Sequence, residues 1–113
     1  MRLYEVAHAR AGDKGNISDI SVIAYRIADF DHIRRHVTTE RVRAHFGESV
    51  RGAIVRFELP QLAALKFVLH DALDGGVTRS LALDSHGKTL SFWMLELDLP
   101  APPRRTDDDS TVA

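Results

Sequence analysis

The sequence predicts an α+β fold, a two-layer sandwich in which two main helical regions pack on an antiparallel-leaning sheet. The chain has 113 residues, a length that suits one hydrophobic core. Segments in which apolar residues alternate lie between segments in which they recur every three or four positions. Hydrophobic residues form 44% and charged residues 27% of the chain, values typical of globular proteins rather than disordered ones.

Three segments have the composition of strands. Residues 2–9 form a short stretch of apolar and polar residues that ends where glycines begin. Residues 19–26 are rich in β-branched and aromatic side chains, which fit a pleated, buried surface. Residues 53–59 alternate with period two until Pro60 removes the backbone donor that a longer ladder would need. We therefore expect strands at these three places.

Helical spacing follows in three other segments. Residues 29–36 and 40–46 carry apolar side chains on one face, with Thr39 as the expected N-cap of the second helix and Gly47 as its stop. Residues 61–73 are expected to form an amphipathic helix. Its apolar face would consist of Leu62, Leu65, Leu69 and Leu73.

The remainder of the ordered chain is expected to be a hairpin. Its strands would be residues 77–83 and 89–99, joined by a turn at residues 84–87. Residues 100–113 carry no cluster of apolar residues and are expected to form a disordered tail behind a domain of residues 1–99. The resulting order, ββαβαββ, is best matched by a ferredoxin-like α+β sandwich.

Composition also limits the function. The formal charge of -1 gives no overall attraction for nucleic acid or for an anionic membrane, and no segment is apolar enough for a signal peptide or membrane span. The chain has no cysteine, which excludes disulfides and thiolate chemistry. The histidine and carboxylate spacings match no metal motif. We expect a cytoplasmic protein without a metal or other cofactor.

Residues 8–16, with the sequence His-Ala-Arg-Ala-Gly-Asp-Lys-Gly-Asn, are the strongest candidate for a functional loop. Gly12 and Gly15 allow a ligand to approach the backbone closely, and Arg10 and Lys14 can donate charge-assisted hydrogen bonds to a phosphate or carboxylate. The spacing matches neither standard nucleotide-binding glycine motif. A solvated turn between two strands explains the same residues structurally.

A second segment, residues 75–80, combines similar chemistry. It could line one site with the first loop, although a helix C-cap followed by a strand explains it equally well. The substrate-binding candidates in the two segments are Arg10, Gly12, Lys14, Gly15, Asn16, Gly75, Gly76, Thr78, Arg79 and Ser80.

Three residues are candidates for proton transfer. His8 adjoins the first loop, His70 lies near the second, and Asp13 lies within the first. Structural roles explain each of them as well, because Asp is common in turns and no activating partner is evident from the sequence.

Five segments of the sequence together have a family likeness: His8–Asn16, Thr39–Phe46, Arg56–Pro60, Phe67–His70 and Gly75–Leu81. With these segments the chain resembles the AtuA-like ferredoxin-fold domain over nearly all of residues 2–98. In that family, Ser is expected where this chain has Ala11, and Asp is more common where it has Asn16.

The resemblance implies a small component that works with a larger AtuA-type partner in acyclic terpene utilisation or related acyl-CoA catabolism. One hypothesis is a subunit, in a homo- or hetero-oligomer, that helps to bind or process a carboxylate or CoA thioester; hydratase or lyase chemistry would be compatible with this role. The alternative is a noncatalytic structural or regulatory module that stabilises the larger partner through its sheet or helical surface.

Overall fold

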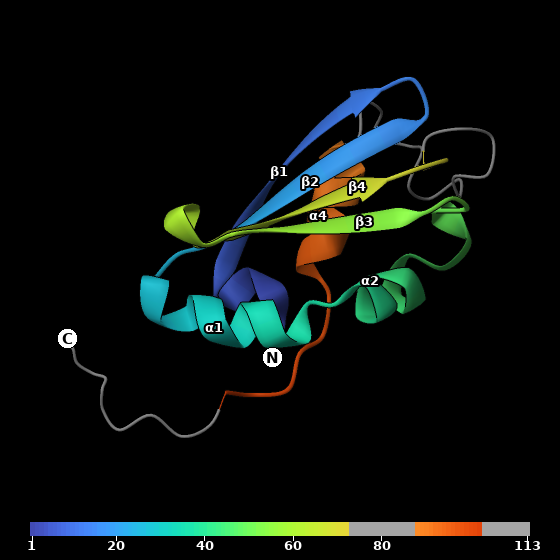
Figure 1. Cartoon of the computed structure of the whole chain (residues 1–113). Coiled ribbons are helices and arrows are strands. Elements are labelled where there is room, and N and C mark those ends of the chain that lie inside the picture. Colours follow the sequence, from blue (N-terminus) through green and yellow to red (C-terminus); the bar gives the residue numbers. More distant parts are fainter. Residues whose placement is uncertain (73–87, 103–113) are drawn as a thin grey trace.

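The computed structural model describes residues 1–72 and 88–102, which form a two-layer α+β domain. Its sheet has four antiparallel strands in the order β1-β2-β4-β3 (Figure 1). The strands are β1 (Ala7–Lys14), β2 (Ile17–Ala24), β3 (Ile54–Leu59) and β4 (Ala64–Leu69).

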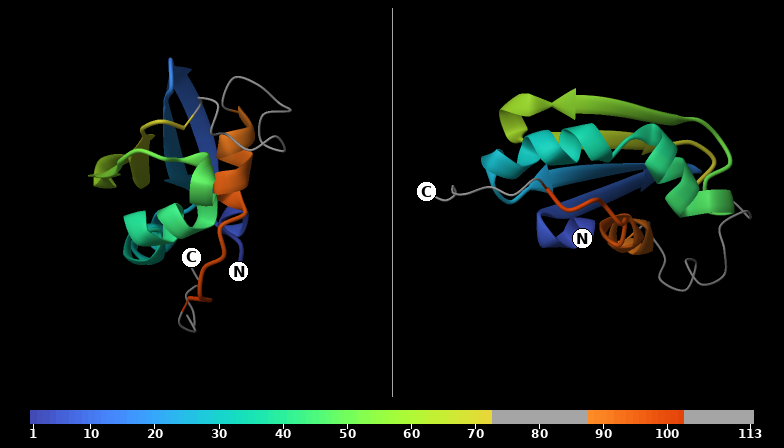
Figure 2. Two further views of the ribbon diagram at one scale, coloured as in Figure 1. Left: turned by 90° about the vertical axis from the view of Figure 1, so that its right-hand side faces the viewer. Right: turned by 90° about the horizontal axis from the view of Figure 1, so that it is seen from below.

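The described helices lie on one side of this sheet, and the other side has no covering element among the described residues (Figure 2). The α-helices are α1 (Ile27–His36), α2 (Thr39–Phe46) and α4 (Lys88–Leu95). Short 3₁₀ helices are η1 (Leu3–Glu5), η2 (Gly47–Ser49) and η3 (Pro60–Leu62). The sheet therefore has a covered face and an open face.

The connections contain a split βαβ unit. β2 leads through α1 and α2 to β3, and β4 is inserted between these two strands, which makes β2 and β3 parallel to each other. Together with β4 and α4, this is the ferredoxin-like arrangement. In the common ferredoxin-like order, the last strand follows the second helix. Here that edge position, beside β2, is taken by β1, which comes first in the chain. The predicted fold class is confirmed, whereas the predicted element order is wrong after β3.

The core lies between the covered face and the helices. Ile20 is opposite Phe67, and Val22 is opposite Leu65, so each pair points to the same side of the sheet. All four side chains are completely buried. They pack in one cluster with side chains from the helices and chain ends, including Leu3, Ile33, Val37, Val42, Phe46, Leu90, Met94, Leu97 and Leu99.

The helices expected near residues 29–36 and 40–46 are confirmed as α1 and α2. The N-cap of α2 is Thr38 rather than Thr39, because the Thr38 hydroxyl accepts a hydrogen bond from the backbone N–H of Arg41 at 3.1 Å. Gly47 ends the helix with φ of 57°, a value that favours glycine.

The prediction of a helix at residues 61–73 is wrong. Only a 3₁₀ turn forms after Pro60, and it ends at Ala63 with a left-handed φ of 50°. Residues 64–69 then form a central strand. The leucines at helical spacing suggested a helix, but Leu65, Phe67 and Leu69 are also spaced at period two, and as a strand they point together into the core.

The C-terminal strand prediction at residues 89–99 is also wrong. Residues 88–95 form α4, which buries Leu90, Ser91 and Met94 against the sheet and η1. These buried positions recur with helical spacing, whereas the Leu, Phe and Trp content of the segment and the turn expected before it favoured a strand. The other predicted hairpin strand, 77–83, and the turn 84–87 lie outside the described residues.

Residues 97–99 return alongside the beginning of the chain. The backbone N–H of Leu3 donates to the carbonyl of Leu97 at 2.9 Å, and that of Leu99 donates to the carbonyl of Met1 at 2.7 Å. Nε2 of buried His32 then lies 2.8 Å from the carbonyl oxygen of Pro100. These contacts join the two ends of the domain under the helical layer. Most of the predicted tail, residues 103–113, lies outside the described residues.

The backbone at Gly52 packs closely against His70, with no room for a side chain. A Cβ atom there would lie 2.8 Å from both Cβ and the carbonyl oxygen of His70. We expect Gly52→Ala to lower the free energy of unfolding by about 1–3 kcal/mol, because the backbone would have to shift. Urea unfolding measures this loss.

Gly12→Ala is the matched control for Gly52→Ala. A Cβ atom at Gly12 would have its nearest contact at 3.6 Å, with the Asp19 carboxylate, which is ordinary van der Waals distance. We expect a change within about 0.5 kcal/mol for this variant. Equal losses of unfolding free energy in the two variants would contradict the importance of the close contact between Gly52 and His70.

Candidate functional site

The segment predicted as a loop, residues 8–16, is mostly a β-hairpin. β1 extends to Lys14, which pairs with Ile17, and only Gly15 and Asn16 form the turn. Gly15 has φ of 65°, the sign that the first central residue of a tight hairpin turn requires. The strand expected at residues 2–9 is correspondingly shifted, because residues 3–5 form η1. The strand therefore continues through Gly12 and ends only before Gly15, whereas the glycine-rich sequence suggested a loop.

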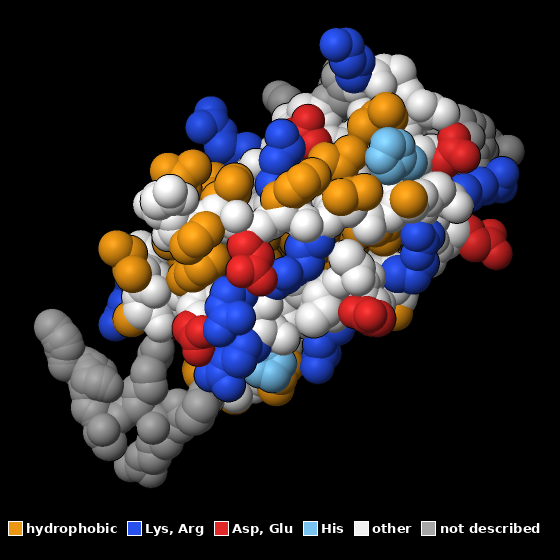
Figure 3. Space-filling model, viewed as in Figure 1, with side chains coloured by type: hydrophobic (Ala, Val, Ile, Leu, Met, Phe, Trp, Pro, Cys, Tyr) orange, Lys and Arg blue, Asp and Glu red, His pale blue; other side chains and the backbone are white. Residues whose placement is uncertain are grey.

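The hairpin presents alternate side chains on the open face. Opposed residues in the register share a face, and β2 turns Ile20 and Val22 towards the core, so their sequence neighbours point the other way. The described strand residues on the open face are His8, Arg10, Gly12, Lys14, Ile17, Asp19, Ser21, Ile23, Val55, Phe57, Leu59, Ala64, Lys66 and Val68. Figure 3 shows a band of hydrophobic side chains over the strands, with Lys and Arg side chains beside it.

Three cations lie on this open face. Arg10 and Lys66 flank Ser21 across neighbouring strands, with Cα atoms about 10 Å apart at ordinary strand spacing, and Lys14 lies further along β1. None of the three side chains forms a hydrogen bond or ion pair with another described residue. Asp19 is the one carboxylate on this face in residues 1–72 and 88–102. No group among the described residues therefore binds these cationic side chains in place of an external anion.

Lys66 was missed by the sequence analysis. The expected helix at residues 61–73 assigned it no relation to the hairpin, whereas β4 places it beside Ser21. The signal that could have identified it is its position between the apolar residues Leu65 and Phe67, which in a strand turns the lysine away from these buried side chains.

The hairpin turn is attached to the end of β4. Nδ2 of Asn16 donates to Oδ1 of Asp71 at 2.7 Å, and the backbone N–H of Ala72 donates to the carbonyl oxygen of Asn16 at 2.8 Å. Asp71 has a left-handed φ of 55°, which Asp tolerates better than most residues. The chain therefore leaves the described region beside the hairpin turn. Gly75, Gly76, Thr78, Arg79 and Ser80 come next in the sequence and lie outside the described residues.

The two candidate histidines lie at opposite ends of the sheet. His8 is opposite Ile23 and stacks on Tyr25 with ring centroids 5.4 Å apart. His70 follows Leu69, whose partner on β2 is Ser18. The rise of a strand separates these levels by roughly 17 Å. His8 and His70 are therefore too far apart to act together on one reacting atom, and only His70 lies near the hairpin turn.

The backbone holds His70 firmly in place. Its N–H donates to the carbonyl of Ala53 at 2.9 Å, and its carbonyl accepts from the N–H of Gly52 at 3.0 Å. The side chain is half-buried. Asp13, the third proton-transfer candidate, lies in β1 opposite Ser18, near the same end of the sheet.

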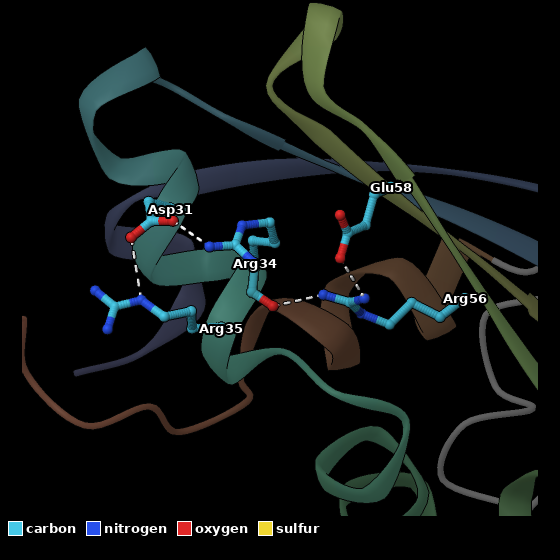
Figure 4. Close-up of polar contacts among 5 residues, drawn as sticks. All are labelled: Asp31, Arg34, Arg35, Arg56 and Glu58. Carbon is cyan, nitrogen blue, oxygen red and sulfur yellow. Dashed lines mark hydrogen bonds and ion pairs between the residues drawn. The ribbon is translucent and has the colours of Figure 1, made fainter.

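Three arginines on the helical side of the sheet, Arg34, Arg35 and Arg56, in contrast, already have partners within the chain (Figure 4). Asp31 binds the guanidinium groups of Arg34 and Arg35 on α1. The hydrogen bond from Arg34 is the main reason why the pKa of Asp31 is lowered and that of Arg34 is raised. Arg56 donates to the carbonyls of Arg34 and of Val37, the latter at 3.0 Å, and so caps the end of α1. This arrangement supports a structural role for these groups.

His45 and Trp93 join α2 to α4. Their rings stack at 4.3 Å, Nε2 of His45 lies 2.6 Å from the carbonyl oxygen of Trp93, and the indole N–H donates to the carbonyl of His45 at 3.1 Å. Burial lowers the pKa of His45, against the opposing effect of the Trp93 carbonyl. Burial also lowers the pKa of His36, whose ring lies 4.5 Å from that of His32.

No group of three or more His, Cys, Asp or Glu residues able to hold a metal ion occurs within residues 1–72 and 88–102. No helix in that part of the chain is long and apolar enough to cross a membrane.

The fold and the open face define a small α+β domain of ferredoxin-like architecture with an uncovered cationic sheet. The family model of the AtuA ferredoxin-like domain matches residues 1–100, and the chain belongs to this family. The predicted resemblance is thereby confirmed. Comparison with curated proteins and with solved structures gives no significant match.

The attachment of the hairpin to the end of β4 can be tested with a double-mutant cycle. We expect Asn16→Ala and Asp71→Ala each to lower the free energy of unfolding, with a coupling energy of about 0.5–1 kcal/mol for this exposed, charge-assisted hydrogen bond. Urea unfolding of the two single variants and the double variant gives the coupling. Strictly additive losses would show that the two side chains do not interact.

The burial of His45 between α2 and α4 predicts that the stability of the protein depends on pH. The folded state lowers the pKa of His45, so the unfolded state binds more protons near that pKa. The contribution of neutral His45 to the free energy of unfolding is therefore complete above the pKa of about 6.5 in the unfolded chain, and it is lost as the pH falls below that value. We expect the free energy of unfolding to fall between about pH 7.5 and pH 5.5, and to fall less in His45→Gln. The same pH dependence in both proteins would contradict this assignment.

Proposed function

We propose that this chain, with its domain at residues 1–99, is the small subunit of an assembly with a larger AtuA-type protein. In this proposal the open face helps to bind a carboxylated or acyl-CoA substrate where the two subunits meet. The observation that carries the proposal is that Arg10, Lys14 and Lys66 lie on an uncovered sheet face without a described anionic partner. The family membership supports the choice of partner.

The hairpin end of the open face is the preferred position for the anionic group. Lys14 lies at the turn, and the attachment of Asn16 to Asp71 brings the start of the segment that carries Arg79 to the same end. Two basic side chains can bind different oxygens of one phosphate or carboxylate. The side chain of Asn16 is already used in holding the turn, so its proposed contribution is to position the site.

Other predicted residues have more limited roles in this proposal. Gly75, Gly76, Thr78 and Ser80 would supply backbone and hydroxyl donors. His70 and Asp13 are the proton-transfer candidates near the hairpin turn, and His8, at the other end of the sheet, would act separately. A reaction on the acyl-CoA substrate and a cytoplasmic location remain parts of the proposal.

The structural alternative is favoured by a different observation. Val55 and Phe57 are 38% and 47% exposed on the open face, and Phe92 of α4 is 64% exposed. Apolar side chains at these places suit contact with another protein surface. A module that only stabilises the larger partner would use these side chains and need no free cations.

Binding of CoA to the purified complex distinguishes the two functions. The chain is coexpressed with the larger AtuA-type protein, and CoA and acetyl-CoA are titrated calorimetrically. We expect Lys14→Ala and Lys66→Ala each to raise the Kd about tenfold, because each removes one charge-assisted contact.

Arg35→Ala is the control, since it removes a cation that is paired with Asp31 on the helical layer. We expect its Kd to equal that of the wild type. Formation of the complex with an unchanged Kd in all three variants would refute substrate binding by the open face and support the structural alternative. Failure of the two proteins to associate would refute both.

A further inference from the structure

We infer that β3 is a self-association edge, along which two copies of this chain pair β3 with β3 in antiparallel orientation around a two-fold axis at Phe57. β3 is the last strand of the sheet and pairs with β4 on one side only. Among the described residues, its backbone forms no backbone hydrogen bond outside that ladder. A row of backbone donors and acceptors is therefore free along its other side.

The side chains of β3 protect this edge only in part. Proteins usually blunt an edge strand with charged side chains, especially lysine, with proline or with a bulge. β3 contains no lysine, proline or bulge between Ile54 and Leu59, and its charged residues Arg56 and Glu58 alternate with Val55 and Phe57, which are substantially exposed apolar side chains on the open face. Pro60 limits the length of the edge but leaves its centre accessible.

The sequence of β3 is complementary to itself in one register. On the covered side the strand carries Arg56 and Glu58. If Phe57 faces Phe57 of the second copy, each Arg56 lies opposite a Glu58, and each Val55 lies opposite a Leu59. Opposite charges and apolar side chains are then matched along the whole edge.

Neighbouring registers are poorer. A shift by two residues in either direction puts Arg56 opposite Arg56, or Glu58 opposite Glu58, and like charges directly opposed are destabilising. A shift by one residue puts Phe57 opposite Arg56 in one direction and opposite Glu58 in the other, and either shift places the helical layers of the two copies on opposite sides of the sheet. Of these registers, only the one centred on Phe57 both places opposite charges face to face and keeps the two helical layers on the same side of the sheet.

The side chain of Arg56 is already held in place within each copy. Its guanidinium donates to the carbonyl of Val37 at 3.0 Å and to Oε2 of Glu58 at 3.0 Å. Glu58 is 44% exposed, so its carboxylate can accept a further hydrogen bond from a second copy. Little side-chain freedom of Arg56 is lost on association.

The opposite edge of the sheet is less suited to such pairing. α4 packs against β1 there, as both views in Figure 2 show. At the centre of β1, Ala11 and Gly12 offer little side chain for cross-strand packing. Pairing through β3 gives one continuous sheet and leaves the β1–β2 hairpin free, so this inference does not depend on the proposed function.

Sedimentation of the purified chain tests the inference. We expect a concentration-dependent equilibrium between monomer and dimer, with a micromolar Kd, because strand pairing buries less than the roughly 1,600 Å² of a standard interface. Phe57→Lys and Phe57→Glu should each raise the Kd by at least about tenfold, because each places like charges opposite one another at the axis.

An equimolar mixture of Phe57→Lys and Phe57→Glu should form a mixed dimer again, since Lys then lies opposite Glu. This recovery also shows that both variants are folded. Phe92→Lys, an exposed substitution on α4, is the matched control and should dimerise like the wild type. A monomeric wild type, dimerisation unaffected by either Phe57 variant, or a mixture that stays monomeric would overturn the inference.

Discussion

The pairing of β4 with β2 and β3 is the interaction on which the rest of the structure depends. It puts Phe67 and Leu65 beside Ile20 and Val22, and these side chains fill the centre of the core. Burying each such side chain contributes about 1.5–3 kcal/mol, so the pairing provides a large part of the stability. The same pairing turns Lys66 to the open face and brings Asp71 to the hairpin turn. Core and candidate site therefore have one structural origin.

The distribution of charge follows from the two layers. On the helical side, Asp31 forms ion pairs with Arg34 and Arg35, and Arg56 binds helix carbonyls. On the open face, the cations have no such described partners. The formal net charge of -1 does not reveal this separation, because it adds charged groups that are paired to charged groups that have no described partner. The open face can thus attract an anion locally although the chain as a whole does not.

Local patterns predicted those parts of the fold that local interactions determine. The helices α1 and α2 and the strand β3 were identified because caps, periodicity and Pro60 all act within a few residues. Residues 61–73 and 89–99 were assigned wrongly because their apolar spacing fits two periods, and packing against β2 and β1 decides between them. The same non-local pairing explains why Lys66 escaped notice.

For the candidate site, the sequence predicted the residue types but not their arrangement. Arg10 and Lys14 were identified from their glycine-rich context, yet they lie on a strand rather than a flexible loop. His8 and His70 were grouped by proximity to the two motifs, and the strand register separates them. Which of these residues take part in binding or catalysis stays a prediction.

Nuclear magnetic resonance measures the central pairing most directly. If β4 is the central strand, backbone chemical shifts of residues 64–69 will be those of extended structure, and cross-strand nuclear Overhauser effects will connect Ser21 with Lys66 and Ile20 with Phe67. Helical shifts through residues 61–73, without those cross-strand effects, would contradict the pairing. They would also remove Lys66 from the open face.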